Sequence, residues 1–331
     1  MKGWTSNMLR LAAGLLTAQF MLAGIAVAQH FPNRLLTLVV PYGPGGNIDP
    51  VARVLARALS DVLGQQVIVE NRPGAAGWIG ARQVAGAAPD GYTLLLSASG
   101  LFTIAPLLYS DRIGFDPIQD FAPIGGAAEV PIVLVVGPSV KAQNVKELLE
   151  EAKTKKGGLT AGTAGNGTTS HLITAMFEQE SKAEITAVTY KAGTQVAVDM
   201  MAGLVDIAFD QVPSSLGLVR AGKLRAFAVL SPQRSTMVPD VPTSTEVGLP
   251  LLQAMSFYGI SAPAATPPET LQILRDAMTR ILRLPETKAA LRQVNTQPIE
   301  ASATEYSRMI VDDLARWKKV IADSNIKPSE Q

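Results

Sequence analysis

The sequence of 331 residues lacks cysteine and contains only two histidines, His30 and His171. Without cysteine the chain forms no disulfide, offers no thiolate to a metal ion and has no cysteine nucleophile. Two histidines also leave little room for a metal site built on imidazole groups. We therefore expect neither a metal site nor a cofactor.

A surplus of either charge is absent as well. Lys and Arg total 29 against 28 Asp and Glu, and charged residues make up only 17% of the chain. A nucleic-acid-binding protein usually carries a basic surplus, and a disordered chain combines low hydrophobicity with high net charge. Because 47% of the residues are hydrophobic, we expect a folded protein that does not bind nucleic acid.

Apolar runs long enough to span a bilayer are absent beyond the N-terminus. The one long apolar stretch, residues 11–27, follows two basic residues and ends in Ala26-Val27-Ala28, a small-x-small cleavage pattern. This layout is typical of a secretory signal peptide. An uncleaved membrane anchor is the alternative, since the stretch nearly has the length of a membrane span. We expect residues 1–28 to be removed and the mature protein to be exported without stable membrane insertion.

Short apolar runs alternate with amphipathic stretches along the rest of the chain. The run 35–40 ends at a loop rich in Pro and Gly, after which apolar residues recur at helical spacing over 51–62. Weaker copies of this unit follow, and the pattern restarts after the apolar run 130–136, which has the composition of a buried strand. Such alternation is typical of an α/β fold, so we expect mostly parallel sheets flanked by helices.

The length favours two domains, because the mature chain has about 300 residues and a domain commonly has about 150. Three expected helices at the C-terminus have apolar faces but no sheet of their own, so we expect them to pack on the first domain. This arrangement predicts domain 1 from residues 29–130 and 253–331, and an inserted domain 2 from residues 131–252. The two crossing segments form a hinge, and the cleft lies between the domains.

Ligands of open α/β sheets bind beyond the carboxyl ends of the strands. Two glycine-rich loops, 41–49 and 162–170, stand at such ends, and each leads into an expected helix whose free N–H groups and dipole favour an anion. Neither loop matches a P-loop or a G-x-G-x-x-G motif. An ordinary strand-to-helix connection is the alternative for each loop, but their matching positions in two domains favour a binding site.

Two residues of these loops have competing explanations. Asp49 stands at the expected N-cap of the helix after the first loop, a role that needs no ligand. His171 begins the helix after the second loop, as a ligand contact, a helix-start group or a base. A catalytic base requires a nucleophile and an orienting acid, and G-x-S-x-G is absent. We therefore predict no catalytic residue and no enzyme, with an exported hydrolase that uses His171 as the lesser alternative.

Several segments taken together resemble the TctC-like, or Bug, substrate-binding receptors of tripartite tricarboxylate transporters. The resemblance covers essentially the whole mature chain and includes VVPYGPGGNID at 39–49 and GNGTTSHL at 165–172. It implies a periplasmic two-domain binding protein of the Venus-flytrap type, type II-like, that is a monomer. It also implies a small carboxylate ligand and integral membrane transporter subunits as partners. The other segments that carry it are 69–77, 88–94, 190–191, 205–206, 221–226 and 239–243.

The resemblance further implies that the two loops grip a ligand carboxylate through backbone amides, hydroxyls and ordered water. Three positions depart from the family pattern: Gly43 replaces a frequent Pro, Asn47 a frequent Gly, and Ile48 a frequent Thr or Ser. The hydroxyl missing at Ile48 suggests a less polar ligand or reliance on backbone contacts. By family position and at the strand ends, the predicted ligand-binding residues are Tyr42, Gly43, Gly46, Ile48, Asp49, Ser97, Thr163, Asn166, Thr168, Thr169, Ser170 and Asp210.

A sensory role is a further function that the sequence allows. A sensory receptor that presents its bound ligand to a signalling protein needs the same cleft and the same carboxylate-binding loops. The residues therefore do not distinguish transport from sensing, nor do they identify the ligand.

Overall fold

The structure is a computed structural model, and it describes residues 31–165, 168–190 and 193–323. The predicted signal peptide lies outside the described residues, as does Asn166 of the predicted site. The chain divides into two compact units, residues 1–33 and residues 34–331. All features below belong to the second unit.

The described strands belong to one hydrogen-bonded sheet of ten strands. Its main path runs β2-β1-β3-β9-β4-β7-β5-β6, and β8 and β10 both pair with β4. The strands are β1 (Leu36–Val40), β2 (Val67–Asn71), β3 (Thr93–Ala98), β4 (Phe121–Val136), β5 (Leu159–Thr163), β6 (Ile185–Thr189), β7 (Ile207–Gln211), β8 (Arg225–Val229), β9 (Met255–Pro263) and β10 (Gln297–Ala301).

Helices connect most of these strands, in the alternation that the sequence predicts. The helices are α2 (Ile48–Leu63), α3 (Trp78–Ala85), α4 (Ser99–Thr103), α5 (Ala105–Ile113), α6 (Val145–Thr154), α7 (Thr169–Ser181), α8 (Gly193–Met201), α9 (Val212–Arg220), α10 (Pro268–Arg283), α11 (Pro285–Gln293) and α12 (Ala303–Asp323).

Strand directions divide the sheet into two groups. In the first group β1, β2, β3 and the first part of β4 run in one direction, and β9 and β10 run against them. In the second group β5, β6, β7 and β8 share one direction, and the second part of β4 runs against them. Most strands of each group are therefore parallel, which confirms the predicted α/β fold class.

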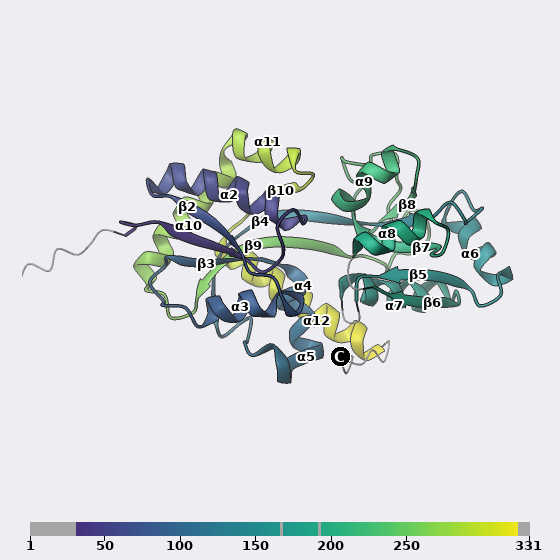
Figure 1. The fold of residues 1–331 in the computed structure, drawn as a ribbon, viewed down its shortest axis with the longest axis horizontal. Helices are drawn as coiled ribbons and strands as arrows, with labels where there is room; N and C mark the ends of the chain where they lie inside the picture. Colours follow the sequence, from purple (N-terminus) through teal and green to yellow (C-terminus); the bar gives the residue numbers. More distant parts are fainter. Residues whose placement is uncertain (1–30, 166–167, 191–192, 324–331) are drawn as a thin grey trace, which may run out of the picture. The chain divides into compact units, whose positions relative to one another are not determined.

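The long strand β4 belongs to both groups. It pairs with β9 as far as Pro131, opposite Met255, and it pairs with β7 from Ile132, opposite Gln211. Figure 1 shows β4 running from the part of the sheet beside α2 to the part beside α8 and α9. The change of neighbour between Pro131 and Ile132 marks the boundary between the two strand groups.

The apolar run 130–136 forms the second part of β4 and is buried on both faces. Ile132 and Leu134 lie in a core with residues of α6 and α7, whereas Val133 and Val135 lie in a core with residues of α8 and α9. Successive side chains of a strand point to opposite faces. A strand covered by helices on both faces therefore needs an unbroken apolar sequence, which explains the run.

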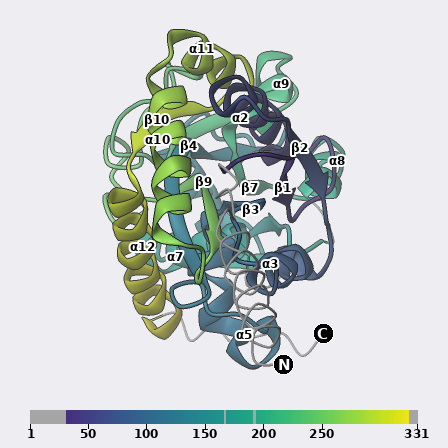
Figure 2. The ribbon, with the colours of Figure 1, turned by 90° about the vertical axis from the view of Figure 1, so that its left-hand side faces the viewer.

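Helices also cover both faces of the first group. Figure 2 shows α2 and α3 on opposite sides of β1 and β3. On the side of α3, residues Val39 and Leu95 share a core with Phe102 of α4 and Tyr306 of α12. On the other side, α10 and α11 pack against α2. The strands of this group are thus enclosed between two helical layers.

The last helix, α12, contacts both groups. Its Tyr306 and Ile310 lie in the core of the first group, whereas Trp317 lies in the core of the second group with Phe177. Arg316 also donates a hydrogen bond of 2.5 Å to the backbone carbonyl of Gln253, just before β9. The C-terminal helices were predicted to pack on the first domain alone. For α12 this prediction is correct for the first half of the helix only, because the second half packs in the core of the second group.

The sequence does not predict helices α4 and α5 or strand β10, and each omission has a physical reason. In α4 the consecutive residues Leu101, Phe102 and Thr103 are all buried, so the segment has no helical period of polar and apolar positions. α5 contains a non-helical residue, Tyr109. β10 has the polar sequence QPIEA, and its proline is tolerated because β10 pairs only with β4.

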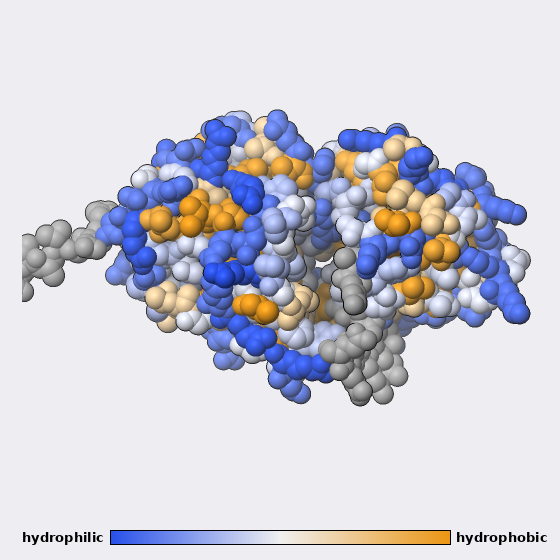
Figure 3. Space-filling view, viewed as in Figure 1, coloured by the Kyte–Doolittle hydropathy of each residue, from blue (hydrophilic) through white to orange (hydrophobic). Residues whose placement is uncertain are grey.

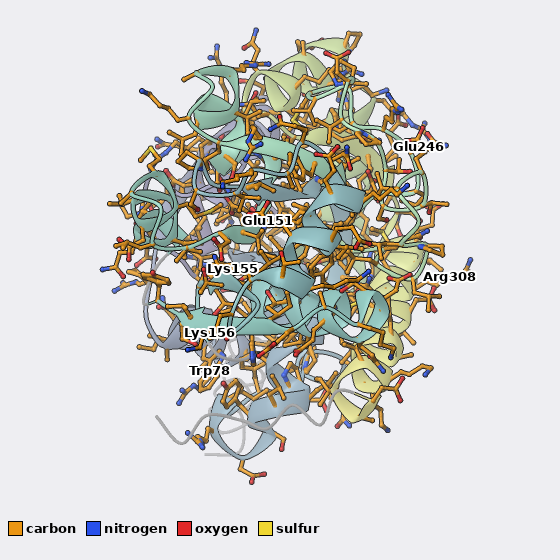
Figure 4. All side chains as sticks on the ribbon, turned by 90° about the vertical axis from the view of Figure 1, so that its right-hand side faces the viewer. Trp78, Glu151, Lys155, Lys156, Glu246 and Arg308 are labelled. Atoms are coloured by element: carbon orange, nitrogen blue, oxygen red, sulfur yellow. The ribbon has the colours of Figure 1, made fainter. Side chains whose placement is uncertain are left out.

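A buried carboxylate holds the edge of the second group opposite the predicted loops. Asp206 accepts hydrogen bonds from Nζ of Lys155 at 2.5 and 2.6 Å, and from the amide and hydroxyl of Thr160 at 2.7 and 2.8 Å. Burial raises the pKa of Asp206, but these donors outweigh burial and bring the pKa below its ordinary value. Figure 4 shows Lys155 and the neighbouring Glu151 on the face turned to the viewer. This charged cluster is structural, because its members satisfy one another.

Candidate functional site

The loop between β1 and α2 is held in shape by the carboxylate of Asp49. Its Oδ2 accepts a hydrogen bond of 3.1 Å from the amide of Gly45, and its Oδ1 accepts one of 3.0 Å from Nδ2 of Asn71. The guanidinium of Arg53 donates to both carboxylate oxygens at 3.1 and 3.2 Å. Asp49 is only 4% exposed. Its hydrogen-bonding capacity is therefore used largely within the protein.

The predicted N-cap role of Asp49 is wrong. α2 begins at Ile48, its N-cap position is Asn47, and Asp49 lies inside the first turn. An N-cap side chain accepts from an amide two or three residues ahead, whereas Asp49 accepts from Gly45, four residues behind. Gly45 has a φ of +80°, which glycine adopts without strain. The carboxylate therefore fixes the preceding loop, and the helix starts without a side-chain cap.

The ionisation of Asp49 follows from these contacts. Burial raises its pKa, but hydrogen bonds from three donors outweigh this and bring the pKa below the ordinary value of 3.8. The carboxylate is thus charged at neutral pH and is neutralised by Arg53. The carboxylate that shapes the first loop is consequently not left as an unpaired charge.

The loop between β5 and α7 is held by hydroxyl groups instead. Thr168 is the N-cap of α7, and its Oγ1 donates 2.7 Å to the carbonyl of Gly165 and lies 3.4 Å from the amide of His171. The hydroxyl of Ser170 lies 3.0 Å from that of Thr168 and accepts a hydrogen bond of 3.1 Å from the amide of Ala164. The second loop therefore keeps its shape with neutral groups.

Two threonines beside this loop have unusual surroundings. Thr163 is fully buried, and its hydroxyl has no hydrogen-bond partner among the described residues. Buried polar groups nearly always have a partner, so this hydroxyl is a candidate contact for a ligand or a water molecule. Thr169 lies against Gly100 at the start of α4, where a Cβ would stand 3.0 Å from its Oγ1. The end of β3 and the start of α7 therefore meet closely.

A third cluster surrounds the end of β7. Asp210 accepts hydrogen bonds from the hydroxyl of Ser215 at 2.5 Å and from the amide of Gln211 at 2.8 Å. Burial raises the pKa of Asp210 and raises that of Tyr42 to about 12. The pKa of Tyr258 is raised by burial and further by the charges of Tyr42 and Asp210. Gln211 links two of these residues, because its amide donates to Asp210 and its Oε1 accepts from the hydroxyl of Tyr258.

The first loop reaches the end of β7 directly. Nδ2 of Asn47 donates 2.7 Å to Oε1 of Gln211 and 2.7 Å to Oγ of Ser214. The hydroxyl of Tyr258 donates 2.9 Å to the same Oε1. The space-filling view is hollowed between the surface over α2 and the surface over α9 (Figure 3). The structure therefore brings together the ends of β1 and β7, which are far apart in sequence.

Other predicted residues lie less directly at these loops. Ser97 is 1% exposed, and its hydroxyl lies 3.2 Å from that of Tyr306, so it points toward α12. The side chain of Ile48 is also buried. Gly43 and Gly46 lie in the first loop, where a Cβ on Gly43 would meet open space.

Four residues that organise the site were not among the predicted ligand contacts. Asn71 donates 3.1 Å to the carbonyl of Tyr42 as well as to Asp49. It lies in one of the segments that carry the family resemblance, which is a usable signal. Asn47 is marked in the sequence only as a departure from the family pattern, and Gln211 directly follows the predicted residue Asp210. Tyr258 lies inside an apolar strand and gives no signal in the sequence.

A separate surface pocket lies on α8. Its volume is about 340 Å³, and its lining includes Tyr190, Val198 and Asp199. The hydroxyl of Tyr190 donates a hydrogen bond of 2.7 Å to Asp199. These two polar groups are paired with each other rather than directed at a ligand.

The described residues contain neither a metal-binding cluster nor a membrane-spanning helix. Among residues 31–165, 168–190 and 193–323, no cluster of three His, Cys, Asp or Glu side chains is arranged to hold a metal ion. Over the same residues, no helix combines the length and the apolar character needed to cross a membrane. Burial lowers the pKa of His171, so its imidazole is neutral at pH 7.

Known proteins resemble this chain over nearly its whole length. The family described as "Tripartite tricarboxylate transporter family receptor" matches residues 51–326. Protein BugT of Bordetella pertussis is 34% identical over 323 residues, which cover 97% of this chain and 99% of BugT. The structure of the periplasmic binding protein BugD has a TM-score of 0.79 at 30% identity and covers 90% of this chain and 100% of BugD. Rpa4515 of R. palustris, solved with adipate, has a TM-score of 0.82 at 33% identity, with coverages of 90% and 100%.

Proposed function

Because the chain belongs to the tripartite tricarboxylate transporter receptor family, we propose that it captures a small carboxylate between its two strand groups for integral membrane transporter subunits. Proteins of this kind are solute-binding receptors, which confirms the predicted family and the prediction that the chain is not an enzyme. The adipate in Rpa4515 supports a dicarboxylate as the ligand class.

The two strand groups act as the two domains of this receptor. Residues 29–130 and 253–331 form the first domain, and residues 131–252 form the second. The change of neighbour along β4 between Pro131 and Ile132 supports the first boundary. The start of β9 at Met255 supports the second. These two crossings are the hinge about which the domains close on the ligand.

The matched geometry of the two glycine-rich loops carries the proposal. Each loop contains a glycine with positive φ, Gly45 at +80° and Gly165 at +129°, and each leads into a helix of more than twelve residues. Free N–H groups at such helix starts bind carboxylates without a cationic side chain. Arg53, which lies one turn into α2, is already engaged by Asp49. Neutral donors therefore bind the ligand.

Ligand contacts divide between the two loops. On the first side they come from Tyr42 and the backbone of Gly43 and Gly46, with Asp49 shaping the loop from behind. On the second side the unpartnered hydroxyl of Thr163 is the strongest side-chain candidate. The remaining contacts on this side are Asn166, Thr168, Thr169, Ser170 and Asp210.

The protein works in the periplasm as a monomer. The apolar N-terminal stretch with its small-x-small pattern supports export and cleavage after residue 28. A soluble receptor that meets membrane subunits only transiently needs no membrane anchor of its own.

A ligand screen on the purified mature chain tests this function. The panel contains dicarboxylates of four to eight carbons, hydroxylated and plain, with the matching neutral diamides as controls. A true ligand at about 100 times its Kd stabilises the protein by about 2.7 kcal/mol and raises the melting temperature. Mass spectrometry of the purified protein then identifies any ligand that it retains. Absence of a shift with every carboxylate contradicts the proposal.

Thr163→Val provides a sharper test of the site. The substitution keeps the shape and removes a hydroxyl that has no partner among the described residues, so we expect little cost to the fold. We expect about tenfold weaker ligand binding with unchanged or slightly higher stability. Ser244→Ala is the matched control, because Ser244 also carries a buried hydroxyl without a partner among the described residues, away from both loops. Equal binding by wild type and Thr163→Val removes Thr163 from the site.

A further inference from the structure

We infer that Asn47 and Gln211 form a latch that holds the two strand groups together and slows ligand release. The latch is a direct protein contact, made by side chains that are not themselves required to touch the ligand. It rests on the proposed function in one respect, because the ligand whose release it slows is the proposed carboxylate. Its effect on the opening of the protein is independent of the ligand.

The contact joins segments that are distant in sequence. Nδ2 of Asn47 lies 2.7 Å from Oε1 of Gln211 and 2.7 Å from Oγ of Ser214, across 164 and 167 residues of chain. Asn47 follows the end of β1 in the first group, whereas Gln211 ends β7 and Ser214 lies in α9 in the second group. A hinge motion at β4 that separates the two groups must break both hydrogen bonds.

Gln211 is held in place to receive this contact. Its Oε1 also accepts a hydrogen bond of 2.9 Å from the hydroxyl of Tyr258, a residue of β9 that is 1% exposed. Two donors therefore converge on one amide oxygen and orient the side chain. Because Tyr258 belongs to the first group, both donors to this oxygen come from one side of the proposed cleft and the acceptor from the other.

The conformation of Asn47 makes the latch a property of its side chain alone. Its backbone is in the right-handed helical region, with φ −56° and ψ −32°, and its side chain makes no capping bond to α2. Replacing it with alanine therefore leaves the backbone and the helix start undisturbed. Glycine, the residue that the family resemblance leads one to expect here, has no side chain to reach Gln211.

The latch acts by changing the populations of open and closed protein. A contact present only in the closed form raises the fraction of closed protein before ligand arrives and must be broken before ligand leaves. Two hydrogen bonds at a partly exposed position change such an equilibrium by about 1.4 kcal/mol, or about tenfold. We therefore expect the latch to act mainly on the dissociation rate.

The experiment uses the absence of native cysteine, which allows two spin labels to be placed without background. Labels at Arg57→Cys in α2 and Arg220→Cys in α9 lie on exposed positions of the two groups. Double electron–electron resonance then measures their separation in the ligand-free mature protein. Asn47→Ala should move the distance distribution toward longer separations, and stopped-flow kinetics should show about tenfold faster release of a bound dicarboxylate.

Three further variants separate the latch from other causes. The triple variant Asn47→Ala with Gln211→Ala and Ser214→Ala should be no more open than Gln211→Ala with Ser214→Ala, because the latter already lacks both acceptors of Asn47. Tyr258→Phe removes only the orienting hydroxyl and should have an intermediate effect. Gln66→Ala, which removes an exposed amide just beyond α2, should leave both measurements unchanged.

The outcomes are distinct. Unchanged label distances and an unchanged release rate in Asn47→Ala overturn the latch. If no carboxylate binds the wild-type protein, the proposed function fails, and the label distances alone still decide whether Asn47 holds the two groups together. Further opening by Asn47→Ala in the variant that already lacks the side chains of Gln211 and Ser214 also overturns the proposed contact.

Discussion

The two glycine-rich loops reach similar geometry by different chemistry. In the first loop a buried carboxylate, Asp49, gathers an amide, an asparagine and an arginine around itself. In the second loop the hydroxyls of Thr168 and Ser170 hold the backbone without any charge. Both loops contain a glycine with positive φ and lead into a helix start. A glycine-rich loop before a helix can thus be held in shape either by a neutralised ion pair or by neutral groups.

This difference has consequences for how each loop fails. Because the carboxylate of Asp49 binds several partners, the shape of the first loop depends largely on this one side chain. The hydroxyl network of the second loop is shared between two side chains, each with fewer bonds. We therefore expect substitutions in the first loop to cause larger losses than equivalent substitutions in the second.

The largest effect is expected from Asp49→Ala. The substitution leaves the amide of Gly45 and Nδ2 of Asn71 without their acceptor and releases Arg53. Loss of these contacts should lower the free energy of unfolding by about 2–3 kcal/mol and weaken ligand binding about a hundredfold or more. Urea denaturation and titration calorimetry measure the two effects. Asp49→Asn keeps the shape and should lose less of both, and equal losses would mean that charge alone matters.

A smaller effect is expected from Thr168→Ala. The variant loses the N-cap of α7 and the bond to the carbonyl of Gly165. Removing such a cap costs about 1 kcal/mol, and we expect about tenfold weaker ligand binding. Thr168→Ser, which keeps the hydroxyl, should restore both. If Thr168→Ala proves as damaging as Asp49→Ala, the proposed difference between the loops does not hold.

The two loops should also differ in their response to acid. The pKa of Asp49 is lowered in the folded protein, so its contribution to stability is present above pH 3.8 and is lost as pH falls below that value. Burial lowers the pKa of His171 from 6.5, so the unfolded chain binds this proton more tightly and stability declines as pH falls below 6.5. Unfolding free energies measured from pH 3 to pH 8 should therefore show two separate declines.

Two variants test which residue causes each decline in the free energy of unfolding. His171→Gln should flatten the decline between pH 6.5 and pH 5 and leave the one below pH 4 in place. Asp49→Asn should leave the first decline in place and reduce the one below pH 4, part of which remains because the pKa of Asp206 is also lowered in the folded protein. An unchanged slope in His171→Gln would show that this histidine does not titrate differently in the two states.

Much of the fold could be predicted because its signals are local. The run 130–136 is apolar at every position, as a strand buried on both faces requires. Gly64, of the residue type that most often ends a helix, is the left-handed C-cap of α2 with φ +65°. In contrast, β10 and α4 depend on partners far along the chain, so their own sequences carry little signal.

The site was less predictable than the fold for the same reason. The glycine-rich loops are visible in sequence, but the residues that shape them come from elsewhere. Asn71 lies 22 residues from Asp49, and Gln211 lies 164 residues from Asn47. The role of Asp49 was predicted wrongly because an N-cap accepts from an amide two or three residues ahead, whereas Asp49 accepts from Gly45 behind it, from Asn71 in β2 and from the side chain of Arg53. Pairwise contacts over such distances follow from tertiary packing alone.

The smallest effect is expected at Ile48, where the family pattern has a frequent Thr or Ser. Ile48 is 4% exposed, so Ile48→Thr places a hydroxyl at a largely buried position at the start of α2. We expect no more than about a threefold change in affinity for plain dicarboxylates, and a selective gain for hydroxylated ones if the hydroxyl reaches the ligand. Ile48→Val, which loses one methylene and adds no polar group, is the matched control. Calorimetric titration of the two variants with paired ligands measures the change, and an identical ranking of ligands in both variants would mean that the first loop selects its ligand through backbone amides alone.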